Sequence, residues 1–507
     1  MKKFFLGVCL LLSASLALAQ MPEGTRREAA QAILQGNDAQ AVQLLRPWAE
    51  RADAWAQYSL GVMYYRGRGV AQDYTKAREW LEKAATQGNA NAQFSLGLMY
   101  KNGRGVAQDY AQAREWLEKA ATQGLAEAQF NLGVMHKNGQ GVAQSYAKAR
   151  EWWEKAAAQG NAQAQYNLGV MYHDGYGVAQ DYAQAREWWE KAAAQGHAEA
   201  QHNLGVMYHD GHGAAQDYAK AQDWFEKAAA QGFVEAQTNL GVMYYRGRGV
   251  AQDYSKAREW WEKAAAQGNA GAQSNLGVMY EYGQGVAQND AKAREWFEKA
   301  AAQGLAEAQY NLGLIYGAGR GVAQDDAKAR EWYEKAAAQG HAGAQTNLGL
   351  IYDTGRGVAQ DDARARKWYE QAAAQGNAEA QYNLGVMYHT GQGVAQSYAR
   401  AHEWFEKAAA QGDAYAQYNL GVMYRDGQGV ARNYAQARKW WEKAAAQGDA
   451  DAQYGLGVMY YDGRGVAKDL FKAREWFEQA AVQRENAENT EAVRRARQAL
   501  ERMRQGR

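Results

Sequence analysis

The stretch Asn161–Gly196 reads NAQAQYNLGVMYHDGYGVAQDYAQAREWWEKAAAQG, and the rest of the chain repeats this pattern with small changes. Its Leu-Gly pair returns every 36 residues without an insertion. A fixed period of this size is typical of a solenoid, whose units bury their apolar side chains against one another. The twelve copies are marked by Leu60, Leu96, Leu132, Leu168, Leu204, Leu240, Leu276, Leu312, Leu348, Leu384, Leu420 and Leu456.

Each copy carries the start and stop signals of two helices. In the first copy, Asp53 is a helix-capping residue, apolar residues follow at helical spacing, and Gly67 suits the left-handed position that ends a helix. A loop then leads to Asp73, where every copy has a short polar residue that can cap a second helix. These residues are Asp73, Asp109, Ser145, Asp181, Asp217, Asp253, Asn289, Asp325, Asp361, Ser397, Asn433 and Asp469. The sequence therefore predicts an all-α fold of twelve helix-loop-helix repeats.

The second helix of each copy has an apolar face that includes alanines and large aromatic residues. In the first copy this face carries Ala77, Trp80 and Leu81, and the helix ends at Gly88. The position of Trp80 is tryptophan in all twelve copies, so we expect it to lie in the core. Glu79 and Lys83 are one turn apart and are expected to pair on the outside.

The repeat pattern resembles the Sel-1-like repeat, a relative of the tetratricopeptide repeat. The shared pattern is A-x-A-Q-[YF]-[NS]-L-G-x-M-Y-x-x-G-x-G-V, followed by a capped helix with A-x-x-W-x-x-x-A-A-x-x-G, and it covers 53–484. The resemblance implies antiparallel helix pairs stacked into a right-handed α-solenoid superhelix, with the first helices along a concave face. Arg484 replaces the last stop glycine, so the final helix is expected to end differently.

The ends of the chain differ from the repeats. Residues 1–19 have two lysines, an apolar run and Ala17-Leu18-Ala19, which predicts a cleaved secretory signal peptide. The one cysteine, Cys9, lies inside this segment, and the residues before it fit a lipoprotein cleavage box badly. Residues 20–52 are expected to form a degenerate capping repeat, and 485–507 a capping helix with a basic outer face. The predicted location is the periplasm or the exterior.

Composition argues against several classes of partner. The chain has 57 basic and 56 acidic residues, so its overall charge favours neither nucleic acid nor an anionic membrane. After the signal peptide, no apolar run is long enough to cross a bilayer. We expect a monomer without a transmembrane segment in the mature chain.

Catalytic and metal-binding motifs are weak in this sequence. Ser145 to Lys148 match the S-x-x-K pattern of penicillin-recognising enzymes, but Ser145 stands at a helix-cap position and Lys148 at a surface position of the repeat. His173 and His209 occupy equivalent positions of adjacent copies, about 10 Å apart, which is too far for two rings to share a metal unaided. We therefore expect no catalytic residues, no metal and no cofactor.

The resemblance points to the first helices as the binding surface. In tetratricopeptide repeats the ligand-facing positions correspond to those of Trp55, Tyr58, Val62, Tyr65 and Arg66, which differ most between copies apart from the aliphatic Val62 position. Aromatic anchors often carry interface energy, although a tyrosine here could equally belong to the scaffold. The candidate partner-binding residues are Tyr58, Phe94, Phe130, Tyr166, Tyr310, Tyr382, Tyr418 and Tyr454.

Two classes of function fit these observations. The favoured hypothesis is a non-catalytic scaffold of the bacterial cell envelope that binds peptide segments or partner proteins along a concave groove. The alternative is a cell-wall-related enzyme, or an enzyme-like binder of penicillin or muropeptides.

Overall fold

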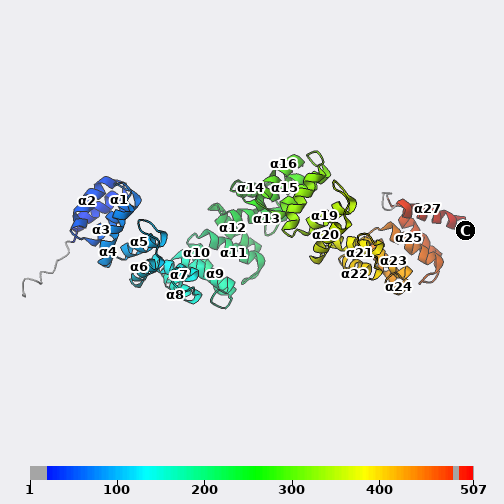
Figure 1. The fold of residues 1–507 in the computed structure, drawn as a ribbon, viewed down its shortest axis with the longest axis horizontal. Coiled ribbons are helices and arrows are strands. Elements are labelled where there is room, and N and C mark those ends of the chain that lie inside the picture. The colour runs from blue at the N-terminus through cyan, green and yellow to red at the C-terminus, as the bar shows by residue number, and fades with distance from the viewer. Residues whose placement is uncertain (1–19, 484–489, 506–507) are drawn as a thin grey trace, which may run out of the picture. The chain divides into compact units, whose positions relative to one another are not determined.

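The computed structural model describes residues 20–483 and 490–505, in which every regular element is an α-helix. The chain divides into two compact units between Gln252 and Asp253. Within each unit the helices follow one another in chain order (Figure 1). The predicted all-α fold of paired helices is confirmed, with 27 helices in the described residues.

The first unit contains a short helix pair followed by five complete repeats and the first helix of the sixth. Its helices are α1 (Glu23–Leu34), α2 (Asp38–Glu50), α3 (Ala54–Arg66), α4 (Tyr74–Thr86), α5 (Ala90–Asn102), α6 (Tyr110–Thr122), α7 (Ala126–Asn138), α8 (Tyr146–Ala158), α9 (Ala162–Asp174), α10 (Tyr182–Ala194), α11 (Ala198–Asp210), α12 (Tyr218–Ala230) and α13 (Val234–Arg246).

The second unit begins with the second helix of the sixth repeat and ends with a single helix. Its helices are α14 (Tyr254–Ala266), α15 (Ala270–Tyr282), α16 (Asp290–Ala302), α17 (Ala306–Ala318), α18 (Asp326–Ala338), α19 (Ala342–Thr354), α20 (Asp362–Ala374), α21 (Ala378–Thr390), α22 (Tyr398–Ala410), α23 (Ala414–Asp426), α24 (Tyr434–Ala446), α25 (Ala450–Asp462), α26 (Leu470–Ala481) and α27 (Thr490–Arg504).

The predicted helix caps are present in the structure. The Asn161 side chain accepts a hydrogen bond from the Ala164 amide at 2.9 Å at the start of α9. Gly175 closes the same helix with a φ of +74°, a conformation that favours glycine. All twelve predicted caps of the second helices accept such a hydrogen bond. Cap chemistry therefore fixes where the second helix of each repeat begins.

The core of each repeat lies between the glycine of its Leu-Gly pair and a large side chain of the second helix. A Cβ atom at Gly169 would lie 2.3 Å from the Trp189 ring, so the two helices approach closely because this residue is glycine. Trp189 and Leu168 are both buried. The equivalent residues Trp153, Phe225, Phe297, Tyr333, Tyr369, Phe405, Trp441 and Phe477 are buried as well.

The expectation that the Trp80 position forms the core was wrong. Trp80 is partly exposed, whereas its neighbour Leu81 is buried. One residue of helix turns a side chain by about 100°, so only one of the two can face the first helix. The Trp80 position instead lies at the edge of the core, as Trp152 does when it packs against the cluster formed by α6 and α7.

The expected pair between Glu79 and Lys83 is also not what the structure shows. Lys83 Nζ lies 4.3 Å from the centre of the Trp80 ring, and Arg78 rather than Lys83 pairs with an acid, Glu82. A cation over an indole face is favourable, and the Lys83 side chain covers the exposed side of the Trp80 ring. Lysine and tryptophan stack in this way in ten repeats.

A ladder of buried glutamines joins successive helices, and the sequence analysis did not predict these hydrogen bonds. Gln165 Nε2 donates to the Ala157 carbonyl at 3.2 Å, which links α9 to α8. The same side chain accepts from Gln195 Nε2 at 2.8 Å, at the end of α10. One side chain thus satisfies polar groups from three consecutive helices, as buried polar groups require.

The described terminal helices cover the ends of the repeat array. α1 and α2 pack against each other and share a core cluster with α3, in which Leu45 is fully buried. α27 packs Ala496 against Phe477 of α26. Its basic face is partly neutralised, because Arg494 and Arg495 both pair with Glu491. The predicted signal peptide and Arg484 lie outside the described residues.

Candidate protein-interaction face

The five positions expected to face a ligand lie on the first helix of each repeat. In α3, the side chains of Trp55, Tyr58, Val62 and Tyr65 are partly exposed, and Arg66 is exposed. We call the residues at these five positions, in every repeat, the first-helix face.

The aromatic residues at the Tyr58 position lie at the seam between successive first helices. The ring centroids of Tyr310 and Tyr333, in the same repeat, are 5.9 Å apart. Tyr310 also stacks on His341, at the start of the next first helix, with ring centroids 4.5 Å apart. Tyr382 similarly contacts Phe405 and Tyr415. These rings therefore stabilise the scaffold with one side, and their remaining exposed surface is what a ligand can reach.

In the first unit, the same position also receives an indole hydrogen bond. Trp153 Nε1 donates to the Phe130 carbonyl at 3.1 Å, and Trp189 Nε1 donates to the Tyr166 carbonyl at 3.2 Å. Tyr166 also stacks on His197 at 4.7 Å. The position is thus tied to the repeat core through its backbone as well as its ring.

Two predicted residues near the C-terminus are held by the scaffold. Burial raises the pKa of Tyr418 to about 12, with a smaller contribution from the charge of Asp451. Tyr454 packs against Ala492 and Val493 of α27. The C-terminal helix therefore partly covers Tyr454, whose ring remains partly exposed.

A cavity of about 330 Å³ opens on the first-helix face at α3, α5 and α7. Tyr58, Val62, Tyr65 and Arg66 line it from the first repeat. The other lining residues are Leu81, Asn91, Phe94, Ser95, Leu98, Leu125 and Glu127. Four of the five expected positions, together with Phe94 of the next repeat, thus meet at one hollow.

The same hollow recurs elsewhere in equivalent positions. Val206, His209, Asp210 and Phe225 line a cavity of about 240 Å³ with Asn239 and Val242 of the next repeat; we call it the α11–α13 cavity. A larger cavity of about 700 Å³ lies at α17, α18 and α19; we call it the α17–α19 cavity. All three include the Val62 and Leu81 positions of one repeat and the residue before Leu-Gly in the next. The Leu81 position was missed as a lining residue from the sequence.

The residue before Leu-Gly acts within the scaffold where it is asparagine. Asn131 Oδ1 accepts from Lys101 Nζ at 3.1 Å, and its amide donates to the Glu127 carbonyl at 2.8 Å. Burial lowers the pKa of Lys101. This asparagine therefore links the first helices α5 and α7 through the Lys101 side chain.

The residues considered for chemistry have structural partners. Ser145 Oγ accepts from the Lys148 amide at 3.3 Å as a helix cap, and the Lys148 side chain is exposed. His173 contacts Asp174 at 2.6 Å and packs edge-on against Tyr182. In the described part of the chain, no group of three or more His, Cys, Asp or Glu side chains could hold a metal ion. None of the helices described has the length and hydropathy needed to cross a bilayer.

The model of the Sel1 repeat matches nearly the whole described array, in twelve consecutive segments. The chain belongs to the Sel1 repeat family. Proteins built of Sel1 repeats are often scaffolds that bind other proteins. The matched segments are 56–89, 90–125, 126–161, 162–197, 198–233, 234–269, 270–305, 306–341, 342–377, 378–413, 414–449 and 450–483.

Two solved Sel1 repeat structures are similar to this chain. A protective antigen of uropathogenic Escherichia coli strains, which displays an SLR fold, is 39% identical over 90% of this chain and 97% of its own, with a TM-score of 0.75. A Sel1 repeat protein from Oxalobacter formigenes is 35% identical over 61% of this chain and 90% of its own, with a TM-score of 0.51. No curated protein sequence matches the chain.

Proposed function

We propose that this Sel1 repeat protein is a scaffold of the bacterial cell envelope that binds an extended peptide segment or a helix of a partner protein along its first-helix face. Such a ligand lays side chains into hydrophobic hollows at regular spacing, and specificity comes from the residues around each hollow. The scaffold supplies many copies of one surface with local differences.

The observation that supports this proposal is the recurrence of one hollow at equivalent positions. The cavities at α3–α7, α11–α13 and α17–α19 share an aliphatic Val62-type wall and a floor formed by the large side chain at the Leu81 position. Their rims differ, with Tyr65 and Arg66 in the first and His209 and Asp210 in the second. Repeated apolar hollows with varied rims suit recognition of a defined partner sequence.

Export to the periplasm or the exterior is part of the proposal. It is supported by the signal-peptide pattern in residues 1–19 and by the absence of cysteine from the sequence after Cys9. Fusing residues 1–19 to a reporter that is active outside the cytoplasm tests this step, and cytoplasmic retention of the reporter contradicts it.

The enzyme hypothesis receives no support from the geometry of its motif. The Ser145 hydroxyl accepts a backbone hydrogen bond at the start of α8, in the same way as Asp181 does at the start of α10. A structural role therefore accounts for the serine, and the lysine that follows it is exposed on the helix surface.

Site-specific photo-crosslinking tests the binding face. A photoreactive amino acid replaces Arg66, at the rim of the first cavity, in the chain from residue 20 onward, and the protein is illuminated in envelope extract. The matched control places the same group at Glu79, which is exposed on the outer side of α4. We expect a discrete cross-linked partner from position 66 and none from position 79. Cross-links from position 79 alone would place the partner on the second helices and overturn the proposal.

A further inference from the structure

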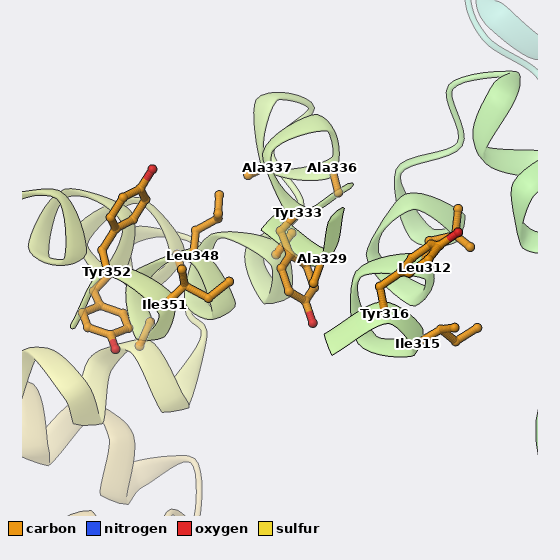
Figure 2. Packing of buried hydrophobic residues seen from close by; sticks show 14 of the residues in the cluster. Leu312, Ile315, Tyr316, Ala329, Tyr333, Ala336, Ala337, Leu348, Ile351 and Tyr352 are labelled. Carbon is orange, nitrogen blue, oxygen red and sulfur yellow. The ribbon is translucent and has the colours of Figure 1, made fainter. Parts of the chain in front are cut away.

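The α17–α19 cavity, at about 700 Å³, is larger than the α3–α7 cavity and the α11–α13 cavity. Leu314, Gly317 and Ala318 of α17 form one wall, and Leu350, Ile351 and Thr354 of α19 form the other. Tyr333 of α18 also lines the cavity, and it lies between the two first helices (Figure 2). The remaining lining residues are Gln324, Asp326, Ala329, Asn347 and Arg356.

The size of this cavity comes from two small residues. Gly317 and Ala318 stand where the first repeat has Tyr65 and Arg66, and the α3–α7 cavity is about half as large. A Cβ atom at Gly317 would meet nothing closer than 3.6 Å, so packing does not require glycine there. By contrast, a Cβ at Gly313 of the same helix would lie 2.4 Å from the Tyr333 ring. Glycine in a helix interior lowers stability, so Gly317 is explained by the space it leaves and not by the fold.

The walls of the cavity are suited to an apolar side chain. Leu314, Leu350, Ile351 and Tyr333 supply apolar surface, and Leu350 is 43% exposed. Leu314 is partly exposed as well, whereas Tyr333 and Ile351 are buried. When a ligand side chain covers an exposed leucine beside an open apolar hollow, the burial of apolar surface favours binding.

The charged residues that line the cavity balance each other, and two further carboxylates lie one repeat along the first-helix face, towards α21. The cavity's own arginine is neutralised, because Arg356 Nε lies 2.9 Å from Asp326 Oδ1. Asp353, next to the lining residue Thr354, shares the Gln392 amide with Asp362, at 2.7 and 3.2 Å. In the described chain, neither of these two carboxylates lies within ion-pair distance of a Lys or Arg. Two neighbouring carboxylates without a cation favour a positively charged ligand.

The pKa shifts of nearby groups agree with the negative charge of these carboxylates. The pKa of Asp353 is raised by burial and by the charge of Asp362. Burial also raises the pKa of Tyr310, with added contributions from Glu379 and Glu307, which lie on the first helices of this unit. Glu379 is exposed, so its charge is available to a ligand that extends along the face towards α21.

We propose that the α17–α19 cavity is the anchor pocket for one large apolar side chain, such as Phe, Leu or Met, of an extended peptide whose adjoining residues are Lys or Arg. The apolar side chain covers Leu350 and fills the space beside Gly317. The basic residues lie against Asp353 and Asp362. This inference rests on the proposed binding function and specifies the chemistry of the partner at one position.

An immobilised array of peptides of about ten residues, varied at random, tests the pocket chemistry with the chain from residue 20 onward. We expect retention of peptides in which a large apolar residue adjoins Lys or Arg. Replacing Gly317→Tyr fills the pocket with a side chain that other repeats carry at this position, and we expect affinity for these peptides to fall by about tenfold. Gly317→Ala is the matched control, because it also replaces a helical glycine with a residue that has a Cβ atom, but it leaves the pocket open.

The charge component has its own variant. Asp353→Asn together with Asp362→Asn should weaken the same peptides, and the remaining binding should lose most of its dependence on salt. The inference is overturned if retained peptides lack the basic and apolar pattern, if none is retained, or if Gly317→Tyr binds as tightly as Gly317→Ala. In each of these cases, a cross-link from position 66 that persists shows that the proposed scaffold function still stands.

Discussion

The adjacent tryptophans of α8 allow a direct test of which side chain holds a repeat together. Trp153 is 1% exposed and its indole donates to the Phe130 carbonyl, whereas Trp152 is partly exposed. Truncating a buried tryptophan to alanine costs about 3–5 kcal/mol, so we expect Trp153→Ala to lower the local unfolding free energy by that amount.

Trp152→Ala should cost less. The substitution removes the partial burial of the ring against the α6–α7 cluster. It also removes the contact with Lys155 Nζ, at 4.2 Å, which is worth about 0.5–1 kcal/mol. We therefore expect a total of about 1–2 kcal/mol. Trp153→Phe is the matched control, because phenylalanine occupies this position at Phe225, and its cost should be about 1 kcal/mol from the lost hydrogen bond.

Native-state hydrogen exchange on peptides from α8 and α9 is the appropriate assay. A long repeat array does not unfold in one step, so a single global midpoint would average the effect away. Exchange reports the free energy of local opening for each segment. If Trp152→Ala exposes α8 and α9 more than Trp153→Ala does, the assignment of the buried helix face is wrong.

Four further predictions follow from particular contacts. Gln165→Leu should destabilise α8–α10 by about 1–2 kcal/mol, measured by hydrogen exchange, because two hydrogen bonds of the glutamine ladder are lost; no loss of protection would contradict this role. Gly317→Ala should stabilise its repeat by about 1 kcal/mol while Gly313→Ala destabilises it, and equal effects in the same assay would refute the packing argument. Folding raises the pKa of Tyr418 to about 12, so the stability that its burial confers should be complete below about pH 10, the pKa of an exposed tyrosine, and should be lost as the pH rises through 12. Tyr418→Phe should reduce this loss of helical circular dichroism at alkaline pH, and an unchanged alkaline transition would refute the prediction. Deleting 161–196 should leave a folded chain shorter by one helix pair, and loss of helical signal well beyond that pair would contradict the repeat architecture.

The fold was predictable because its signals are local and repeated. The caps at Asp73 and its equivalents, and the closing glycines such as Gly67, each act within one turn of the helix that they delimit. Twelve copies of one pattern made each signal easy to identify. For the same reason, the positions of the first-helix face could be assigned by register from a related repeat.

Local signals could not predict which of the two large side chains of the second helix is the more buried. Trp80 and Leu81 are both large and apolar, and helical periodicity alone allows either side chain to face the first helix. The close approach at Gly61, where a Cβ would lie 2.8 Å from the Leu81 side chain, decides between them. That contact joins two helices across the loop, so no property of the second helix alone contains it.

The sequence by itself therefore determined the helices, their boundaries, their pairing into twelve repeats and the positions that share a face. The tertiary structure alone decided which side chains are buried, that α27 covers Tyr454, and which parts of the face are hollow. The physical reason is range: caps and turns depend on neighbouring residues, whereas a hollow such as that beside Gly317 depends on side chains from three helices. A small residue at one position becomes a pocket only when the packing around it leaves the space unfilled.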